Sequence, residues 1–345
     1  MKKVSAIIVN WNGKNVLSGC LESLFEQDYE NLEILVVDNG SQDGSQALVK
    51  KKFPAVELVE NDENIGFGSA VNRGLEKSKG DYFIFLNNDL VLKPNCIREL
   101  TVLLESDSSV GAAIPKILYY PEQGRDALSN TDIINSYGVL INYTGIACPN
   151  LIDQPDQFDL PSIESACGGI FMFSREVYEK VGGFDEDLFL YHEDHDLSWR
   201  IRMMGWKLIA TSNSVCCHHY NFNKGILKFY RSEKNRLHII FKNFECKTLW
   251  LISPALLLVE ISQIVHSIFN GWFHLKIKSY FEIAAQFIQI SRKRRKIQSA
   301  RIVPDSYIIK LYKGTVEVSG LKNPLMDYLL NPILKLYWVC IRNWI

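Results

Sequence analysis

Short apolar runs alternate with helical patterns of apolar residues through the first part of the chain. The run at residues 4–9 is typical of a strand buried on both faces, and further apolar strands are expected at 32–37, 56–59 and 82–86. Between them, apolar positions recur at helical spacing, as at Leu17, Leu21 and Leu24. Strands separated by helices of this length imply crossover connections. This part therefore predicts an α/β fold with a mainly parallel, open twisted sheet flanked by helices.

The pattern becomes irregular over residues 119–165, which are rich in Asn, Asp, Gly, Pro and Tyr. Such a composition predicts long loops and short strands over the sheet edge. Regular structure resumes with an expected strand at 170–173 and an expected helix at 175–181, which Gly182 closes. A further apolar helical stripe starts near Asp194.

The composition shifts again after about residue 224. Residues 249–273 are mostly apolar and long enough to span a bilayer, but Pro254 and Glu260 argue against a simple span. Residues 276–301 carry eight Lys or Arg and one acid, with apolar residues on one helical face. This C-terminal region therefore predicts basic, amphipathic helices that attach peripherally to an anionic membrane surface.

Trp272 and Trp338 are candidate anchors at that interface. The alternative for these helices is packing on the rest of the protein or on a second subunit, because apolar helical stripes are often simply core. Oligomerisation is left open on this basis.

Composition narrows the class of protein. The chain has 345 residues, 47% of them apolar, and a formal net charge of -1, which indicates about two globular domains and no general nucleic-acid binding. The eight cysteines include no Cys-x-x-Cys pair, so we expect reduced, buried thiols. The apolar run at 4–9 is too short for a secretion signal, which predicts a cytoplasmic protein.

Candidate chemistry begins where the strand at 82–86 ends, at Asn87-Asn88-Asp89. Ligands of open α/β sheets bind beyond the carboxyl ends of the strands. A hard divalent cation prefers one or two carboxylates and leaves other positions to phosphate oxygens. Asp89 is thus a candidate metal anchor, and a plain turn is the alternative.

Two glycine-containing loops precede it. Asp38 leaves the second strand, where its carboxylate could accept a hydrogen bond from a nucleobase or a ribose hydroxyl. Gly66 and Gly68 lie at a helix start, a place that favours anions. Arg73 on that helix is a candidate diphosphate partner, although a lone helical Arg is commonly a solvated charge.

Two further clusters lie farther along the chain. The helix N-terminus at Glu193-Asp194 keeps carboxylates ionised, and an ionised Asp194 at a pocket rim could act as a general base. An acidic helix cap is the alternative. A strand ending in His218-His219 could supply a metal ligand, or the two histidines could be structural.

Taken together, the chain resembles family 2 glycosyltransferases with the GT-A fold, especially their bacterial rhamnosyltransferase-like branch. The matching segments lie in the family's order within about residues 4–220 and comprise Ile7–Asn12, Val36–Ser45, Asn64–Gly68, Leu86–Asp89, Gly168–Phe171, Gly182–Glu186 and Glu193–Leu197. Residues 230–237 and 292–297 are similar to the region that follows the catalytic domain in that branch.

The resemblance implies roles for individual residues. Asp194 is the expected catalytic base, and Asp89 with His218 is the expected site for Mg²⁺ or Mn²⁺, His219 being the second choice. Asn87 replaces the first acid of the family's Asp-x-Asp motif, which removes one anionic ligand. The acceptor side is expected at Gly168, Gly169 and Glu193. The expected donor-binding residues are Asn10, Trp11, Asn12, Asp38, Asn64, Gly66, Phe67, Arg73, Asn87 and Asn88.

The resemblance also implies a domain plan. Residues 1–224 are expected to form the GT-A catalytic domain, with a nucleotide-sugar half to about 118 and an acceptor half from about 119. Residues 225–345 are expected to form a helical C-terminal extension, placed at the inner face of the cell membrane.

The expected activity is inverting transfer of a sugar from a nucleotide diphosphate sugar to a hydroxyl of a glycan or lipid-linked glycan, in cell-surface polysaccharide biosynthesis. dTDP-rhamnose is the first expected donor and a UDP-hexose the second. A non-catalytic scaffold that binds nucleotide or polysaccharide is the alternative. A nucleotidyltransferase is disfavoured, because the loop at 10–14 has too little Gly and Arg.

Overall fold

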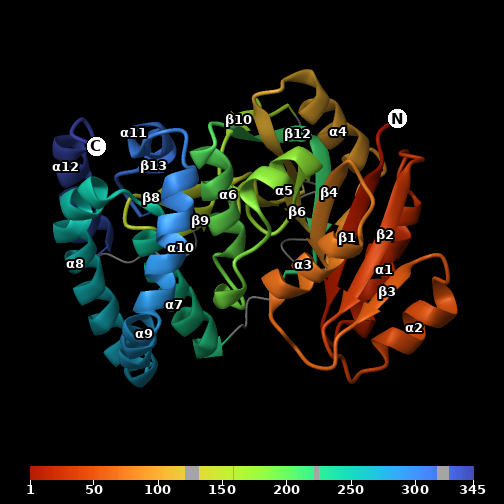
Figure 1. The fold of residues 1–345 in the computed structure, drawn as a ribbon, viewed down its shortest axis with the longest axis horizontal. Helices are drawn as coiled ribbons and strands as arrows, with labels where there is room; N and C mark the ends of the chain where they lie inside the picture. The colour runs from red at the N-terminus through yellow and green to blue at the C-terminus, as the bar shows by residue number, and fades with distance from the viewer. Residues whose placement is uncertain (121–131, 158, 221–224, 317–325) are drawn as a thin grey trace.

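A computed structural model describes residues 1–120, 132–157, 159–220, 225–316 and 326–345. The expected alternation of strands and helices fills the first part of the chain (Figure 1). Its elements are β1 (Val4–Asn10), α1 (Lys14–Phe25), β2 (Leu32–Asp38), α2 (Ser45–Lys52), β3 (Glu57–Glu60), α3 (Phe67–Lys77), β4 (Tyr82–Asn87), β5 (Leu90–Leu92), α4 (Cys96–Ser106) and β6 (Val110–Tyr119).

The segment expected to be irregular contains short strands, and regular structure follows it. The elements are β7 (Ile134–Ser136), β8 (Val139–Asn142), β9 (Ala147–Pro149), β10 (Ile163–Glu164), β11 (Phe171–Ser174), α5 (Arg175–Val181), the short 3₁₀ helix η2 (Glu186–Leu188), α6 (Glu193–Met203) and β12 (Lys207–His218).

Ten of the described strands form one sheet in the order β10-β12-β6-β11-β4-β1-β2-β3, with β5 beside β12 and β7 beside β6, while β8 and β9 belong to a separate three-stranded sheet. The strands β3, β2, β1 and β4 are parallel, as expected. However, β11 runs antiparallel between β4 and β6, so the sheet is mixed rather than mainly parallel. The described residues between β6 and β11 form short strands instead of a crossover helix, and such a path does not impose a parallel direction on β11.

The period-two alternation of strand residues divides the core between the two faces of the sheet. Ala6 and Ile8 of β1 belong to a cluster with buried residues of α1, α2 and α4. Ile7 and Val9 belong to a second cluster with α3, α5 and α6. Helices therefore cover both faces, and the carboxyl ends of β1, β2 and β4 remain at one edge.

The C-terminal region is helical, as expected, and lies at the end of the molecule opposite α1 and α2 (Figure 1). The sequence boundary expected at residue 224 falls in 221–224, outside the described residues. The elements are α7 (Gly225–Asn243), α8 (Cys246–Phe269), α9 (Phe273–Ala285), α10 (Phe287–Ala300), α11 (Asp305–Ile308), η3 (Ile309–Leu311), β13 (Tyr312–Lys313), η4 (Met326–Leu330) and α12 (Asn331–Ile341).

The apolar segment forms one long helix, α8, which is long and apolar enough to cross a membrane by length and composition; 28% of its most apolar window is buried. Glu260 within it faces the protein, where it pairs with Arg236 and lies 2.8 Å from the Lys276 ammonium. Burial alone would raise the pKa of Glu260, but the positive charges of Arg236 and Lys276 outweigh burial and lower it. The acid that argued against a span is therefore neutralised inside the fold.

The basic segment 276–301 forms two helices, α9 and α10, which meet at Gln286. Two expectations for this region were wrong, namely the two interface anchors. Trp272 is fully buried and stacks on Phe229 with ring centroids 5.8 Å apart, and Trp338 stacks on Tyr143 at 4.5 Å, so neither can anchor an interface.

The cysteines are all free, as expected. Five of them are buried, but Cys246 and Cys340 are exposed, so the expectation of buried thiols was wrong at these two positions. Both exposed thiols lie on helices of the C-terminal region.

Candidate active site

Parallel pairing of β1 and β2 places Asn10 beside Asp38 at the carboxyl edge of the sheet. Asp38 is buried and accepts hydrogen bonds from Asn10 Nδ2 at 2.8 Å, from the Ser41 backbone N–H at 2.9 Å and from Gln46 Nε2 at 2.7 Å. These contacts give the Asp38 carboxylate a role within the fold. They hold the loop after β2 against the end of β1.

The loop after β1 joins the same network. Asn10 Oδ1 accepts a hydrogen bond from Asn88 Nδ2 at 2.7 Å, and Asn12 Oδ1 accepts from the Gln42 backbone N–H at 2.8 Å. A Cβ at Gly13 would lie 1.8 Å from Asn88 Nδ2, so a side chain there would have to displace the Asn88 amide. Between Asn10 and Asn12, Trp11 leaves 56% of its surface exposed.

The glycine loop before α3 contacts the loop that precedes α6. Gly66 has a positive φ of 90°, and a Cβ there would lie 2.7 Å from the Phe189 carbonyl oxygen. The Phe67 N–H donates to that oxygen at 2.7 Å, and Asn64 Oδ1 accepts from the Gly66 N–H at 3.0 Å. Arg73 is exposed and donates to Asn61 at 2.5 Å, so this conformation does not bring it to the cavity described below.

Pairing of β5 with β12 places His218 opposite Leu90 and brings it to Asp89. His218 Nε2 lies 3.4 Å from Asp89 Oδ2. His218 Nδ1 lies 3.0 Å from Asn135 Oδ1, and because an amide oxygen only accepts, this contact places a proton on Nδ1 and leaves Nε2 facing Asp89. His219 instead stacks on Tyr120, with ring centroids 3.6 Å apart.

The residues at this position fit a divalent cation. Among the described residues, buried Asp89 Oδ1 has no hydrogen-bond partner, and neither has His218 Nε2. A carboxylate and an imidazole held by the Asn135 amide oxygen are ligands that Mn²⁺ accepts, and the Asn87 amide could offer only its oxygen.

A cavity of about 480 Å³ opens next to this pair. Asn87 and His218 line one part of it, and Asp194 lines another, together with Glu193, Gly168, Gly169 and Phe67. The structure thus brings together part of the expected donor set, the expected metal ligand His218, the expected base and the acceptor side. Asp89 and the remaining expected donor residues do not line this cavity.

Two adjacent carboxyl groups in the cavity have different environments. Asp194 accepts hydrogen bonds from the Gly169 N–H at 3.0 Å and the His195 N–H at 2.7 Å. Burial, and then the charge of Asp194, raise the pKa of Glu193 to about 8. Burial also raises the pKa of Asp194, against those two donors. Near neutral pH, Glu193 therefore keeps its proton, so the expectation that the helix N-terminus keeps its carboxylates ionised was wrong for Glu193, because burial outweighs the helix dipole. Asp194 is the acid of the pair whose charge the two N–H donors favour.

The neighbouring histidines are neutral at that pH. Burial, followed by the charge of Arg236, lowers the pKa of His192 to about 4, and burial lowers that of His195 to about 3. Their ring nitrogens Nδ1 lie 3.3 Å apart. Neither imidazole therefore carries a charge near neutral pH.

The backbone before α6 is strained and is held by the C-terminal region. Phe189, Tyr191 and His192 have φ values of 57°, 73° and 68°, which non-glycine residues rarely adopt. Asn235 of α7 is buried, and its Nδ2 lies 2.7, 2.9 and 2.7 Å from the carbonyl oxygens of Leu188, Leu190 and Tyr191. One amide group therefore fixes the turn that presents Asp194.

We expect Asn235→Ala to lower kcat about 10- to 100-fold, because small displacements of a catalytic group cost this much. The free energy of unfolding should fall by about 2–4 kcal/mol, since carbonyl groups lose their donor. Steady-state kinetics and thermal unfolding measure the two effects. Asn142→Ala, also buried and hydrogen-bonded, is the matched control and should lose stability without this loss of kcat. An unchanged kcat in Asn235→Ala would show that the turn holds itself.

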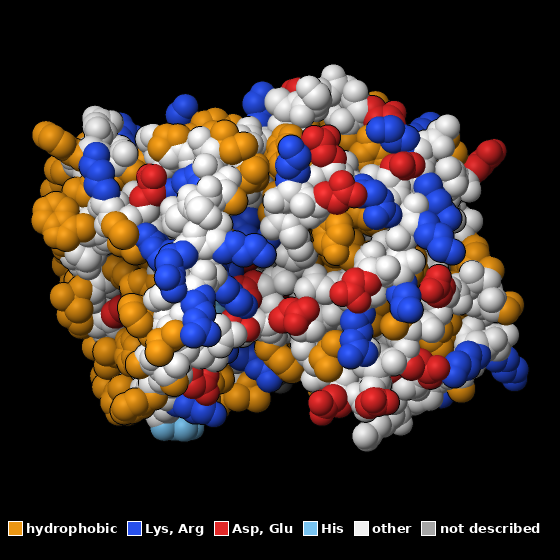
Figure 2. Space-filling model, viewed as in Figure 1, with side chains coloured by type: hydrophobic (Ala, Val, Ile, Leu, Met, Phe, Trp, Pro, Cys, Tyr) orange, Lys and Arg blue, Asp and Glu red, His pale blue; other side chains and the backbone are white. Residues whose placement is uncertain are grey.

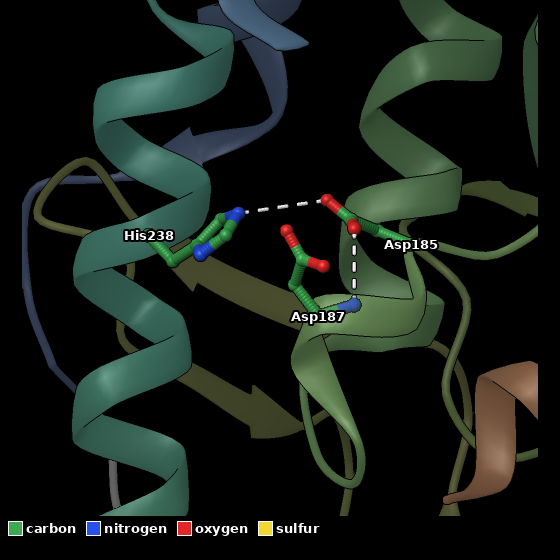
Figure 3. Close-up of side chains that lie close together, drawn as sticks. All are labelled: Asp185, Asp187 and His238. Atoms are coloured by element: carbon green, nitrogen blue, oxygen red, sulfur yellow. Dashed lines mark hydrogen bonds and ion pairs between the residues drawn. The ribbon is translucent and has the colours of Figure 1, made fainter. Parts of the chain in front are cut away.

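A second group of acids lies outside the cavity lining, and Figure 3 shows Asp185, Asp187 and His238 pointing toward one another. The oxygen and nitrogen atoms that they offer lie within 4.8 Å of one another. However, Lys242 and Lys293 pair with Asp185, and Lys293 Nζ lies 2.6 Å from Asp187. Burial raises the pKa of Asp185, but these ammonium groups lower it more. The cluster is an internal ion-pair network that ties α7 and α10 to η2.

Sequence reasoning missed several residues of the site. Asn135 lies in the irregular segment, where no motif marks it. Lys228 and Ser232 of α7 line the cavity, and Asn235 supports it. The signal for α7 was the similarity of residues 230–237 to the region that follows the catalytic domain in the resembling branch.

Residues 5–182, about half of the chain, match the family described as glycosyl transferase family 2. Residues 155–222 also match the family described as the N-terminal domain of galactosyltransferase. An uncharacterised glycosyltransferase of Rickettsia felis is 27% identical over 250 residues, which cover 72% of this chain and 37% of that protein. The chain spans 37% to 57% of the length of the first four curated relatives that it matches.

Solved structures resemble this fold at low sequence identity. GalNAc-T7, solved with UDP, GalNAc and Mn²⁺, has a TM-score of 0.57 and 18% identity, over 74% of this chain and 51% of that one. The mannosyltransferase PcManGT from Pyrobaculum calidifontis, in complex with GDP-Man and Mn²⁺, has a TM-score of 0.51 and 18% identity, over 99% and 87%. The expected GT-A fold is confirmed. With about half of its length matched, the chain belongs to glycosyl transferase family 2.

Proposed function

We propose that this protein transfers a sugar from a nucleotide diphosphate sugar to a hydroxyl of a glycan or lipid-linked glycan, with inversion. The observation that carries the proposal is the shared cavity, which Asp194 lines together with Asn87 and His218. In this arrangement the diphosphate lies at the strand ends, and the acceptor hydroxyl approaches Asp194.

Asp194 acts as the general base. Its carboxylate takes the proton from the acceptor hydroxyl as the new glycosidic bond forms and the bond to the leaving diphosphate breaks. The N–H groups of Gly169 and His195 hold the carboxylate, while protonated Glu193 adds no second charge. One base and one direct displacement suffice, which is why the proposal includes inversion.

Asp89 and His218 are the residues that would hold Mg²⁺ or Mn²⁺, with the Asn87 amide beside them. When bound, such an ion neutralises charge on the leaving diphosphate. The presence of Mn²⁺ beside UDP or GDP-Man in the two structural neighbours supports this assignment.

The finer assignments follow the resemblance to the rhamnosyltransferase-like branch. The first donor is dTDP-rhamnose, the second is a UDP-hexose, and the product serves cell-surface polysaccharide biosynthesis. The protein acts on the cytoplasmic side, at the inner face of the cell membrane, where a lipid-linked acceptor is available.

A non-catalytic scaffold is the second candidate. It is favoured by one observation: the first acid of the family's metal motif is Asn87, which weakens the anionic ligand set. Such a scaffold would bind a nucleotide or a polysaccharide but would release no nucleoside diphosphate.

Addition of the correct nucleotide sugar with Mn²⁺ is expected to raise the Tm, because a ligand at a hundredfold its Kd contributes about 2.7 kcal/mol. Trp11→Ala should weaken donor binding about tenfold by removing a stacking surface for the base. The Tm without ligand should stay unchanged, because Trp11 is largely exposed. Thermal shift across dTDP-, UDP- and GDP-sugars measures both effects.

Trp344→Ala is the matched control, because Trp344 is 70% exposed in the C-terminal region. Donor binding without any release of nucleoside diphosphate would favour the scaffold. If no donor raises the Tm and none is turned over, the proposed function is wrong.

A further inference from the structure

Charge is divided sharply along this chain. Residues 225–345 contain 19 Lys or Arg and 7 Asp or Glu, a net charge of +12, whereas residues 1–224 contain 19 and 32, a net charge of −13. The overall charge of -1 conceals this separation. A strongly basic region on a nearly neutral chain indicates an anionic partner for that region.

The same region presents an apolar face, which we define by the exposed side chains of α8 and α12. They recur at helical spacing and are Trp250, Leu257, Ile261, Ile268, Ile333 and Leu336. The two helices are neighbours, since the Tyr337 hydroxyl donates to the Leu251 carbonyl at 2.8 Å. Figure 2 shows hydrophobic side chains gathered at this end of the molecule.

The opposite side of α8 is packed into the protein. Ile252 and Val259 are buried, and Glu260 pairs with Arg236 and Lys276. If α8 crossed a bilayer, it would have to leave these partners, which would strand charges in an apolar medium. The geometry instead fits a helix that lies along a surface with only its outer stripe immersed.

Basic side chains lie on α10, beside this end of the molecule (Figure 2). Lys293 and Arg294 point inward, to Asp185 and to the carbonyl group of Phe241. Arg292, Arg295 and Lys296 are exposed. These three charges are available to a partner.

We propose that the apolar face and the exposed basic side chains of α10 dock this protein on the surface of an anionic lipid bilayer. An apolar stripe flanked by cations matches the acyl boundary and the acidic headgroups of such a surface. A second copy of the chain is the weaker occupant, because it would bring two basic surfaces together. The inference deepens the proposed function, since it names the surface that would bring the cavity to a lipid-linked acceptor.

The test is flotation of the full chain with vesicles of phosphatidylcholine, alone or mixed with phosphatidylglycerol. We expect binding to the mixed vesicles, which raised salt weakens, and little binding to phosphatidylcholine alone. Replacement of Arg292, Arg295 and Lys296 by Gln should weaken that binding at least about tenfold. The matched control, Lys51→Gln with Lys77→Gln, removes exposed charges of the other region and should bind normally.

The apolar contribution is tested by Leu257→Gln, Ile261→Gln and Leu336→Gln together, which should abolish flotation. Val102→Gln removes an equally exposed apolar side chain from α4 and should leave flotation unchanged. Wild-type protein that fails to float with mixed vesicles would overturn the inference. So would variants that float normally, or a dimer in lipid-free sedimentation that the apolar variant converts to a monomer.

Donor is absent from these assays, and donor-induced thermal shift is measured separately on each variant. Loss of flotation with a normal thermal shift confines the defect to the docking surface. Flotation by a protein that turns over no donor would support docking while the proposed function fails.

Discussion

Asp194→Asn is expected to lower kcat by a factor of about 10² to 10⁴, the range that a positioned general base contributes. The amide keeps the shape of the side chain but cannot take the acceptor proton. Donor-induced thermal shift should persist, because the donor contacts lie at the strand ends. Release of nucleoside diphosphate in the presence of acceptor measures the loss.

Glu193→Gln is the matched control for this prediction. Because the pKa of Glu193 is about 8, the wild-type side chain is protonated near neutral pH, and a neutral amide of the same shape should retain most of the activity. Near-normal transfer by Asp194→Asn would show that the base lies elsewhere.

The dependence of activity on pH gives a related prediction. Turnover requires ionised Asp194, whose pKa burial raises, so activity should begin to fall on acidification above the ordinary carboxyl value of 3.8. In the wild type, loss of the Glu193 proton should change the activity near pH 8. Glu193→Gln lacks this group, so its activity should not change there.

Asp89→Asn is expected to remove the response to Mn²⁺ and to lower kcat on the order of a hundredfold or more, since charge stabilisation by a metal is worth several kcal/mol. The variant removes the acid that lies 3.4 Å from His218 Nε2. Calorimetric titration with Mn²⁺ alone provides a readout independent of turnover, and activity against Mn²⁺ concentration provides the second.

Two further variants serve as comparisons for Asp89→Asn. Asn87→Asp supplies the acid that the family's motif has at this position and should tighten Mn²⁺ binding. Asp107→Asn removes an exposed acid at the end of α4 and should change nothing. Normal Mn²⁺ binding by Asp89→Asn would exclude this site, and loss of binding in Asp185→Asn would place the ion in the lysine-rich cluster instead.

Sequence periodicity predicted the parallel strands and their helices, because burial on both faces leaves continuous apolar runs. It could not predict the direction of β11, which depends on the path of a long excursion and not on local propensity. The strand-end motif pointed to Asn87 and Asp89, because strand ends of one sheet converge on one edge, and an acidic helix N-terminus pointed to Asp194.

Other parts of the site depend on tertiary contacts that no local pattern records. Asn135 meets His218 only through the folded middle segment. Trp272 and Trp338 were expected at an interface because they lie in apolar helices, but aromatic partners from distant segments bury them. Arg73 lies on the predicted helix, but at a position from which its side chain contacts Asn61 instead of the cavity.

The contacts of α7 with the turn before Asp194 have a consequence for truncated forms of the protein. A fragment ending at residue 224 would keep every strand of the ten-stranded sheet but would lose Asn235 and Lys242. Asp185 would then lose both of its ammonium partners, Lys242 and Lys293, and would be left as an uncompensated buried charge, a loss that costs about 3–5 kcal/mol. On the proposed function, the unit needed for turnover therefore extends beyond residue 224, and shortening the chain from its C-terminus would remove the support of Asp194 before it reached the ten-stranded sheet.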